Sequence, residues 1–180
     1  LAAVLLILIG IGALPALAVE VTRGPYLQSG TPDSMVVRWR TDLPTDSRVI
    51  YGNKLSLLTE VVHDSLITTE HEVLLDGLIA GAPHSYAIGT GTEILAGPDP
   101  QHLFLTPPAH GTRQATRVWI LGDSGYGTPD AMAVRDAYYA YAAGYYTDVW
   151  LMLGDNAMPD GTDEQYQATM FDIYGAMLRQ

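Results

Sequence analysis

Residues 118–125, which read VWILGDSG, decide the fold of the second half of the chain. The first four residues form a continuous apolar run, which is typical of a parallel strand buried on both faces. A glycine and an aspartate follow at once. The same arrangement returns at residues 149–156, which read VWLMLGDN. Two such strands joined by one helix form a βαβ unit, so we expect both Gly-Asp pairs at the same edge of one parallel sheet.

Two helices are predicted around the second of these strands. Thr128 is the expected N-cap of the first helix, and Pro129 suits its first turn. A second helix opens at Thr162, where Gln165 three residues later completes a capping box. Apolar residues at helical spacing are expected to face the core. These are Val134, Tyr138, Tyr141, Ala142 and Tyr145 in the first helix, and Tyr166, Met170, Ile173, Tyr174 and Met177 in the second.

Residues 19–107 follow a different pattern, in which short strands are divided by turns. Met35, Val37 and Trp39 alternate with Val36, Arg38 and Arg40, which is the period of a half-buried strand. Prolines such as Pro44 are expected between the strands, where a missing N–H does no harm. The spacing indicates an antiparallel sandwich of immunoglobulin-like size. The other predicted strands include residues 48–52, 72–75, 85–89 and 102–105.

The sandwich and the βαβ segment are predicted to be separate domains. Residues 108–112, which read PAHGT, form the expected linker, because proline stiffens the chain and glycine frees it. The first domain is then 19–107 and the second is 113–180.

Residues 1–18 are interpreted as a signal peptide. The segment carries no charge, contains the apolar run Leu5–Ile9, and ends in Ala16-Leu17-Ala18, the small-x-small form that signal peptidase cleaves. We therefore expect a secreted or periplasmic protein that begins at Val19. The alternative is an uncleaved membrane anchor, since a segment of this length can just span a bilayer. The missing initiator Met and basic segment lead us to expect an incomplete N-terminus.

The composition narrows the possible functions. The chain has 20 acidic and 9 basic side chains and a formal net charge of −11. This balance argues against a nucleic-acid partner, because Lys and Arg hold phosphate backbones, and it suits cation binding better. The chain contains no cysteine, which excludes disulfides, thiolate metal sites and cysteine nucleophiles.

Asp123 and Asp155 are the candidate metal ligands. Two carboxylates held side by side raise one another's pKa unless a cation lies between them. A pair of hard divalent or trivalent ions meets this requirement, and one carboxylate can bridge both ions. A single Gly-Asp pair is more simply a loop or helix cap. The prediction of a metal site therefore rests on the presence of two Gly-Asp pairs at matching strand ends.

The chain resembles the metallophosphoesterase superfamily, and specifically purple acid phosphatases with an N-terminal fibronectin type III-like domain. The resemblance rests on RGPYLQ at 23–28, VRW at 37–39, the 77–86 stretch, FLTPP at 104–108, GDSG at 122–125, LGDNA at 153–157 and DGTD at 160–163. It implies an all-β fibronectin type III-like sandwich, followed by the first βαβα part of an α/β metallophosphoesterase domain.

The resemblance also implies a chemistry. Asp123 would ligate the first metal ion and Asp155 would bridge two, in a dinuclear centre of Fe with Fe, Zn or Mn. The implied activity is hydrolysis of phosphomonoesters by an acid phosphatase-like enzyme, in which the metals activate water and hold the phosphate oxygens. No stable membrane association is expected after cleavage of the signal peptide.

The sequence departs from the family at several ligand positions. Met158 stands where the family has a tyrosine ligand, and a soft thioether is a poor match for ferric iron. Gly125 stands where relatives carry a histidine, and His84 where fibronectin-like domains carry a corner tyrosine. The family also uses an Asn-His pair and three histidines from later loops, whereas all five histidines here precede Asp123. We therefore expect further catalytic residues beyond Gln180, and no activity from these residues alone.

Two other functions match part of the sequence. Gly122-Asp123-Ser124 also fits a block of serine esterases in which Ser124 is the nucleophile. That class needs a catalytic histidine downstream, and none follows in this chain. The other alternative is a non-catalytic exported binding module, in which the β-sandwich is the functional part.

Overall fold

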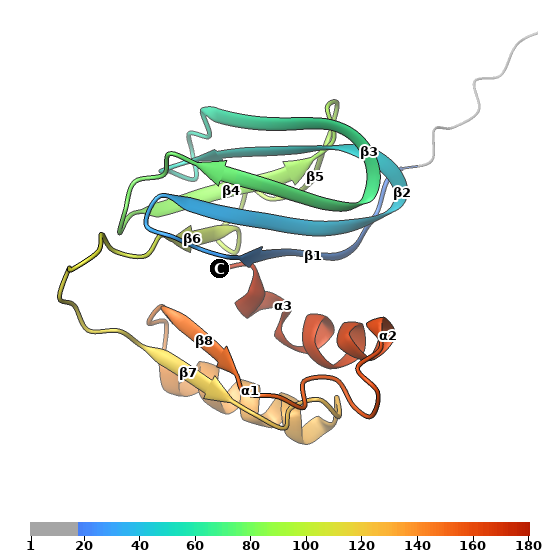
Figure 1. Ribbon diagram of the computed structural model, residues 1–180, viewed down its shortest axis with the longest axis vertical. Helices are drawn as coiled ribbons and strands as arrows, with labels where there is room; N and C mark the ends of the chain where they lie inside the picture. The colour runs from blue at the N-terminus through green and yellow to red at the C-terminus, as the bar shows by residue number, and fades with distance from the viewer. Residues whose placement is uncertain (1–17) are drawn as a thin grey trace, which may run out of the picture.

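The computed structural model describes residues 18–180, so the predicted signal peptide lies almost wholly outside the described part. An antiparallel sheet lies at one end of the molecule and a βαβ unit at the other, with a short helical segment between them (Figure 1). No helix within residues 18–180 is long and apolar enough to cross a membrane. The strands of the antiparallel sheet are β1 (Val21–Gln28), β2 (Ser34–Gly52), β3 (Glu60–Asp76), β4 (Pro83–Gly89), β5 (Ile94–Ala96) and β6 (Leu103–Leu105).

The sandwich is one antiparallel sheet that curls on itself. β3 pairs with both halves of β2, whereas β1 pairs with the first half of β2 and β4 with the second. The register between β2 and β3 shifts between Arg40 and Thr45, and Pro44 lies in this irregular stretch. A missing N–H is tolerated there because the regular ladder is already interrupted. The predicted strands around residues 35–40 and 48–52 are therefore one bent strand, and the placement of Pro44 between strands was wrong.

The alternating residues of the sequence form the core of the sandwich, as predicted. Val37 is fully buried and Trp39 is 1% exposed. Burying such side chains contributes about 1.5–3 kcal/mol each. The core cluster consists of Met35, Val37, Trp39, Val49, Val73, Leu75, Leu78, Tyr86, Ile88 and Phe104.

His84 occupies the position at which a corner tyrosine was expected. Its Nε2 lies 3.3 Å from the carbonyl oxygen of Ile79, and its ring stacks on Phe104 with 5.4 Å between ring centroids. A corner tyrosine makes the same kind of bond to backbone a few residues upstream. The histidine is therefore a local substitute for that tyrosine.

The βαβ unit is confirmed by the strand pairing. β7 (Val118–Leu121) pairs in parallel with β8 (Val149–Met152), with Leu121 opposite Met152, and α1 (Pro129–Ala142) connects them. On one face Trp119 stacks on Tyr138 of α1, with 4.0 Å between ring centroids, and packs against Trp150 at 5.5 Å. The tertiary core of this half is formed by that face alone.

The prediction that both strands are buried on both faces was wrong. Ile120 is 56% exposed and Leu151 is 44% exposed. The described helices pack on the face that carries Trp119, so the opposite face has no cover within residues 18–180. Two of the α1 residues expected in the core are also exposed, because the helix contacts the sheet through a narrow stripe: Val134 at 49% and Tyr141 at 81%. Tyr145, also expected in this helix, lies beyond the end of α1 and is 70% exposed.

The predicted C-terminal helix is split by a π-helical turn. It consists of α2 (Asp163–Tyr166), η1 (Gln167–Phe171) and α3 (Asp172–Leu178). The predicted capping box is present, since Thr162 accepts the N–H of Gln165 and Gln165 binds back to the Thr162 N–H. Ile173 and Tyr174 are buried against the Trp119 cluster, as the apolar stripe predicted.

The C-terminal helical segment lies between the sandwich and the β7–β8 sheet (Figure 1). The hydroxyl of Tyr86 in β4 donates a hydrogen bond to the carbonyl of Arg179 at 2.9 Å. The ring of Tyr26 in β1 packs on Phe171 with 4.9 Å between centroids. An irregular segment from Thr106 to Arg117 connects the two halves along the chain.

His71 is buried in the sandwich between two hydroxyl groups. Its Nε2 lies 2.8 Å from Thr41 Oγ1 and its Nδ1 lies 2.8 Å from Ser47 Oγ. Thr41 donates its own proton to the carbonyl of Leu43, so it accepts the Nε2–H, and Nδ1 accepts from Ser47. Burial lowers the pKa of His71 below its ordinary value of 6.5, against smaller opposing effects of Glu70 and Asp46. The folded state therefore favours the neutral ring.

Protonation of His71 is predicted to destabilise the sandwich. Because its pKa is lower in the folded chain, the unfolded chain binds the proton first, and stability is lost as the pH falls below about 6.5. We expect the free energy of unfolding to decline from pH 7.5 to pH 5 in the wild type. His71→Gln should show a smaller decline and lie about 1–3 kcal/mol lower at pH 7.5, because it cannot satisfy both hydroxyls as well.

Urea unfolding at several pH values measures this effect. His110→Gln is the matched control, because His110 is exposed in the segment that connects the two halves. A His71→Gln profile that keeps the full decline of the wild type would contradict the role of His71.

Candidate functional site

The two Gly-Asp loops lie side by side at the carboxyl ends of β7 and β8. The N–H of Asp123 donates to the carbonyl of Gly154 at 3.2 Å, and the N–H of Leu153 donates to Leu121 at 2.9 Å. These bonds continue the parallel pairing beyond the strands. The structure thus brings together the two loops that carry the predicted metal ligands.

Asp123 and Asp155 share an unusual backbone conformation. Their φ angles are 56° and 53°, in the left-handed region, and Gly154 has a φ of 131°. Few residues other than glycine adopt positive φ, and Asp and Asn are enriched among those that do. Both side chains are exposed at the sheet edge. Strained backbone conformations of this kind are concentrated at functional sites.

Gly125 is required by the close packing of the two loops. A Cβ at this position would stand 2.6 Å from the backbone nitrogen of Ala157 and 2.7 Å from the carbonyl carbon of Asn156. The Gly125 carbonyl also accepts the N–H of Met158 at 2.9 Å. A histidine therefore does not fit at position 125 in this arrangement, and the departure from the family pattern has a steric reason.

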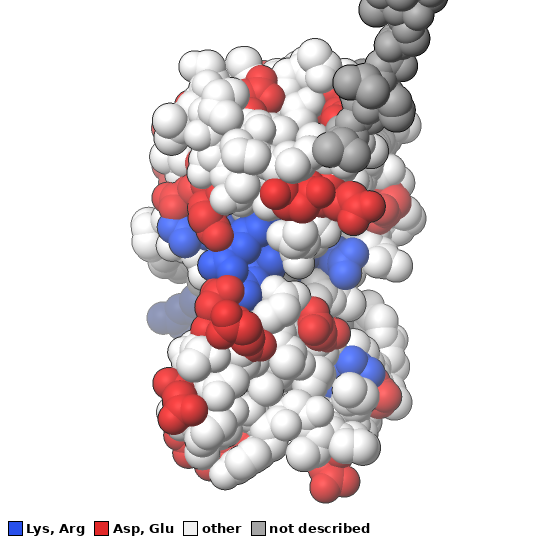
Figure 2. Space-filling view, turned by 90° about the vertical axis from the view of Figure 1, so that its right-hand side faces the viewer, with Lys and Arg blue, Asp and Glu red and all other residues white. Residues whose placement is uncertain are grey.

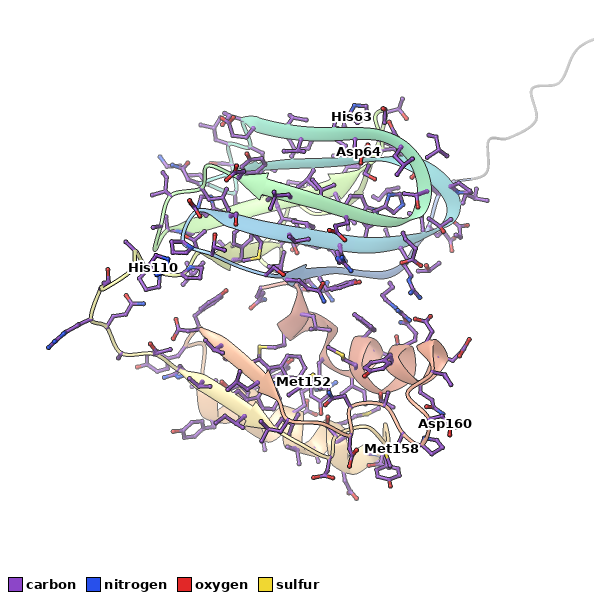
Figure 3. All side chains as sticks on the ribbon, in the orientation of Figure 1. His63, Asp64, His110, Met152, Met158 and Asp160 are labelled. Atoms are coloured by element: carbon purple, nitrogen blue, oxygen red, sulfur yellow. The ribbon has the colours of Figure 1, made fainter. Side chains whose placement is uncertain are left out.

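The donors at these loops match part of a metal site. Asp123 and Asp155 offer carboxylate oxygens, which hard cations prefer. Met158 is half-buried in the loop between β8 and α2, where Figure 3 also places Asp160, and its thioether is soft. Within residues 18–180, no three His, Asp or Glu side chains form a group that could hold a metal ion. Asp123 and Asp155 alone therefore do not form a complete metal site within the described residues.

A hollow of about 370 Å³ opens beside Asp123. Asp130, in the first turn of α1, also lines it. No sequence signal marked Asp130 as a neighbour of Asp123, because only the turn from β7 into α1 brings them to one cavity. The lining residues are Leu121, Gly122, Asp123, Ser124, Tyr126, Thr128, Asp130, Ala131, Val134 and Tyr174.

Ser124 is poorly placed for an esterase nucleophile. The residue is 7% exposed, and its Oγ is buried without a hydrogen-bond partner among the described residues. A nucleophile must reach its substrate and needs an adjacent base. Figure 3 shows His63 on the sandwich and His110 in the connecting segment, and the three other histidines also precede β7. Within residues 18–180, no histidine forms a hydrogen bond with Ser124 Oγ.

Comparisons with known proteins bear on the fold. No family model matches the chain, and no curated protein matches it. A solved structure of PhoD is similar over 77% of this chain, with 17% sequence identity and a TM-score of 0.54. This chain spans 28% of the PhoD chain. The third fibronectin III domain of human KIAA0343 protein is 15% identical, covers 53% of this chain and 85% of that domain, and has a TM-score of 0.31.

The likeness to PhoD shows a shared fold. At 77% of this chain it extends past the sandwich into the segment that follows. The fold shared with PhoD therefore includes residues beyond the antiparallel sandwich.

Gly125→Ala is predicted to destabilise the protein by about 1–3 kcal/mol, because the added methyl group overlaps the backbone of the second Gly-Asp loop. Gly122→Ala is the matched control, since a Cβ there meets nothing nearer than Leu153 Cβ at 3.6 Å. Thermal unfolding should show a clear loss for Gly125→Ala and a change within about 0.5 kcal/mol for Gly122→Ala. Equal losses in the two variants would refute the steric account.

Proposed function

We propose that the protein is an exported metal-dependent phosphoesterase whose catalytic centre includes Asp123 and Asp155. The observation that carries this proposal is the pair of matching left-handed Gly-Asp turns at neighbouring parallel strand ends. The likeness to PhoD supports a phosphoesterase-like relationship, at low identity. Export rests on the uncharged apolar segment before Val19.

The two aspartates would hold the metal ions, with Asp155 as the bridging ligand. Bound metals supply activated water and neutralise charge on the phosphate oxygens of a phosphomonoester. The backbone bonds between the loops hold the two carboxylate-bearing residues in neighbouring turns. A cation bound between the two turns would offset the negative charge of both carboxylates, which is the role proposed for this arrangement.

In the complete gene product that carries this chain, Asp155→Asn is predicted to lower metal content and phosphatase activity more than Asp123→Asn does. The reason is that a bridging carboxylate binds both ions, whereas a terminal ligand binds one. We expect metal content and hydrolysis of p-nitrophenyl phosphate to fall at least about 100-fold for Asp155→Asn, beyond the usual cost of changes outside the ligand shell. Asp136→Asn is the control, because this 63% exposed carboxylate of α1 pairs, among residues 18–180, only with the neighbouring Arg135.

Full metal content and activity in both loop variants would show that the site is wrongly assigned. A complete wild-type product without phosphatase activity would instead favour the non-catalytic binding module.

Met158 provides a spectroscopic test of the same site. A thioether in place of a phenolate should give no visible charge-transfer band, so the iron-loaded complete product is expected to be colourless. Met158→Tyr should gain a visible band, whereas Met158→Leu should not. A purple wild type would contradict the prediction and indicate a substitute phenolate, for which Tyr126, 66% exposed beside Asp123, is the nearest candidate in sequence.

A further inference from the structure

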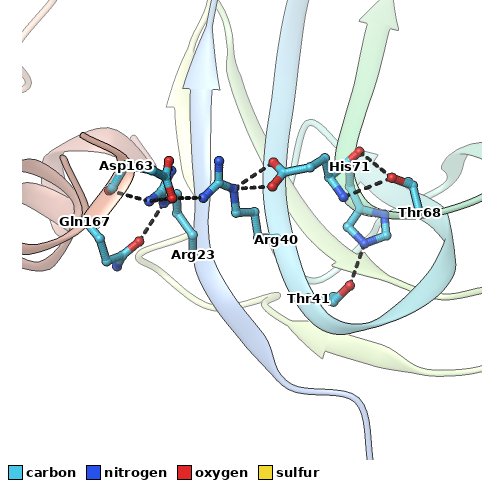
Figure 4. A network of polar contacts seen from close by, with 8 residues as sticks. Arg23, Arg40, Thr41, Thr68, His71, Asp163 and Gln167 are labelled. Carbon is cyan, nitrogen blue, oxygen red and sulfur yellow. Dashed lines mark hydrogen bonds and ion pairs between the residues drawn. The ribbon is translucent and has the colours of Figure 1, made fainter. Parts of the chain in front are cut away.

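Arg23 of β1 connects the sandwich to the α2–η1 segment (Figure 4). The residue is 6% exposed. Its Nη1 and Nη2 donate to the carboxylate of Asp163 at 2.8 and 3.0 Å, and Nη2 also donates to the Asp163 carbonyl at 3.1 Å. Its Nε donates to the side-chain oxygen of Gln167, and the guanidinium lies 4.4 Å from the ring centroid of Phe171. All of these partners belong to the C-terminal helical segment.

A second arginine reinforces this contact. Arg40 of β2 donates to the Asp163 carboxylate and also to Glu70 of β3. Figure 2 shows basic side chains gathered at the waist of the molecule, bordered by acidic ones on either side. Hydrogen bonds from the two arginines hold the pKa of Asp163 far below its ordinary value, so the carboxylate stays charged. A forked arginine–carboxylate pair is geometrically specific, and a buried arginine that loses its partner is costly.

The η1 turn in turn holds the loop that carries Asp155. The hydroxyl of Thr169 is buried and lies 2.8 Å from the carbonyl oxygen of Asn156, the residue after Asp155. The Thr169 hydroxyl is equally close to the carbonyl of Gln165 one turn earlier. The backbone next to the candidate bridging ligand is therefore tied to the helical segment that Arg23 holds.

The far end of the same loop is also tied to this segment. The side-chain oxygen of Gln165 accepts the N–H groups of Asp160 and Thr162, at 2.9 and 3.1 Å. The loop from Asp155 to Thr162 thus has both ends bonded to α2–η1. Its position depends on where that short helix is docked.

We infer that Arg23 is a positioning residue for the Asp155 loop, so that the sandwich takes part in shaping the candidate site. α2 and η1 are too short to be stable alone, and their docking on β1 stabilises them. The catalytic consequence of this inference rests on the proposed function, whereas the structural consequence does not. Loss of the Arg23 fork should loosen the loop at Asn156 while the core of the sandwich remains intact.

Hydrogen exchange of the whole 180-residue chain without metal tests the structural consequence. Arg23→Met keeps the apolar stem and removes the fork, and exchange in a peptide covering residues 154–160 should become about tenfold faster or more. Arg23→Lys, which keeps the charge without the fork, should fall between this variant and the wild type. Arg38→Met is the matched control, because Arg38 pairs with Glu72 on an exposed face of the same sheet. It should leave residues 154–160 unchanged.

Unchanged exchange in residues 154–160 of Arg23→Met would overturn the inference. An equal rise in the sandwich core at residues 35–39 would also overturn it, because that pattern indicates general destabilisation rather than release of one loop.

The catalytic consequence is measured on the complete gene product. Arg23→Met should weaken Mn²⁺ affinity about tenfold and lower kcat, with a smaller change in KM for p-nitrophenyl phosphate, because the Arg23 guanidinium is engaged by Asp163 and Gln167 and is proposed to act through the Asp155 loop. A wild type without metal-dependent activity would overturn the proposed function alone, since the exchange result would still decide the role of Arg23.

Discussion

The parallel pairing of β7 with β8 is the constraint on which the candidate site depends. Because Leu121 lies opposite Met152, the Gly-Asp turn after β8 begins one residue later than the turn after β7, and the two neighbouring turns are joined by backbone hydrogen bonds. The left-handed turns at Asp123 and Asp155 leave both side chains exposed at one edge. Because the two loops lie so close together, position 125 has no room for a side chain and must be glycine. The register of β7 and β8 therefore determines that the two Gly-Asp turns, and the aspartates they carry, lie in neighbouring loops.

Two further layers of contacts support this pairing. The stacked rings of Trp119 and Tyr138 fasten α1 to the covered face of the sheet, and the ring of Tyr174 brings α3 to the same cluster. At the start of α2, Arg23 and Arg40 of the sandwich donate hydrogen bonds to the carboxylate of Asp163. The C-terminal helical segment thus connects a rigid aromatic core to a curled β-sandwich, and the second Gly-Asp loop lies directly before it in the chain.

Local patterns were the reliable part of the sequence prediction. The alternation around Val37 and Trp39 identified the core of the sandwich, and Thr162 with Gln165 identified the start of α2. Both signals act within a few residues, where spacing alone determines which side chains or backbone groups meet. The curl of β2 at Pro44 was missed, because a bend within one continuous strand resembles two short strands in sequence. Exposure of Ile120 was missed because burial depends on which elements cover a face.

The sequence by itself determined the order of elements, the parallel βαβ unit and the two aspartates that end its strands. Tertiary structure decided what lies around those aspartates. It places Asp130 beside Asp123 in one hollow, excludes a side chain at Gly125 and joins Arg23 to Asp163 across 140 positions of the chain. No periodicity or capping rule reaches that distance, because such contacts arise only when two independently formed elements pack against each other.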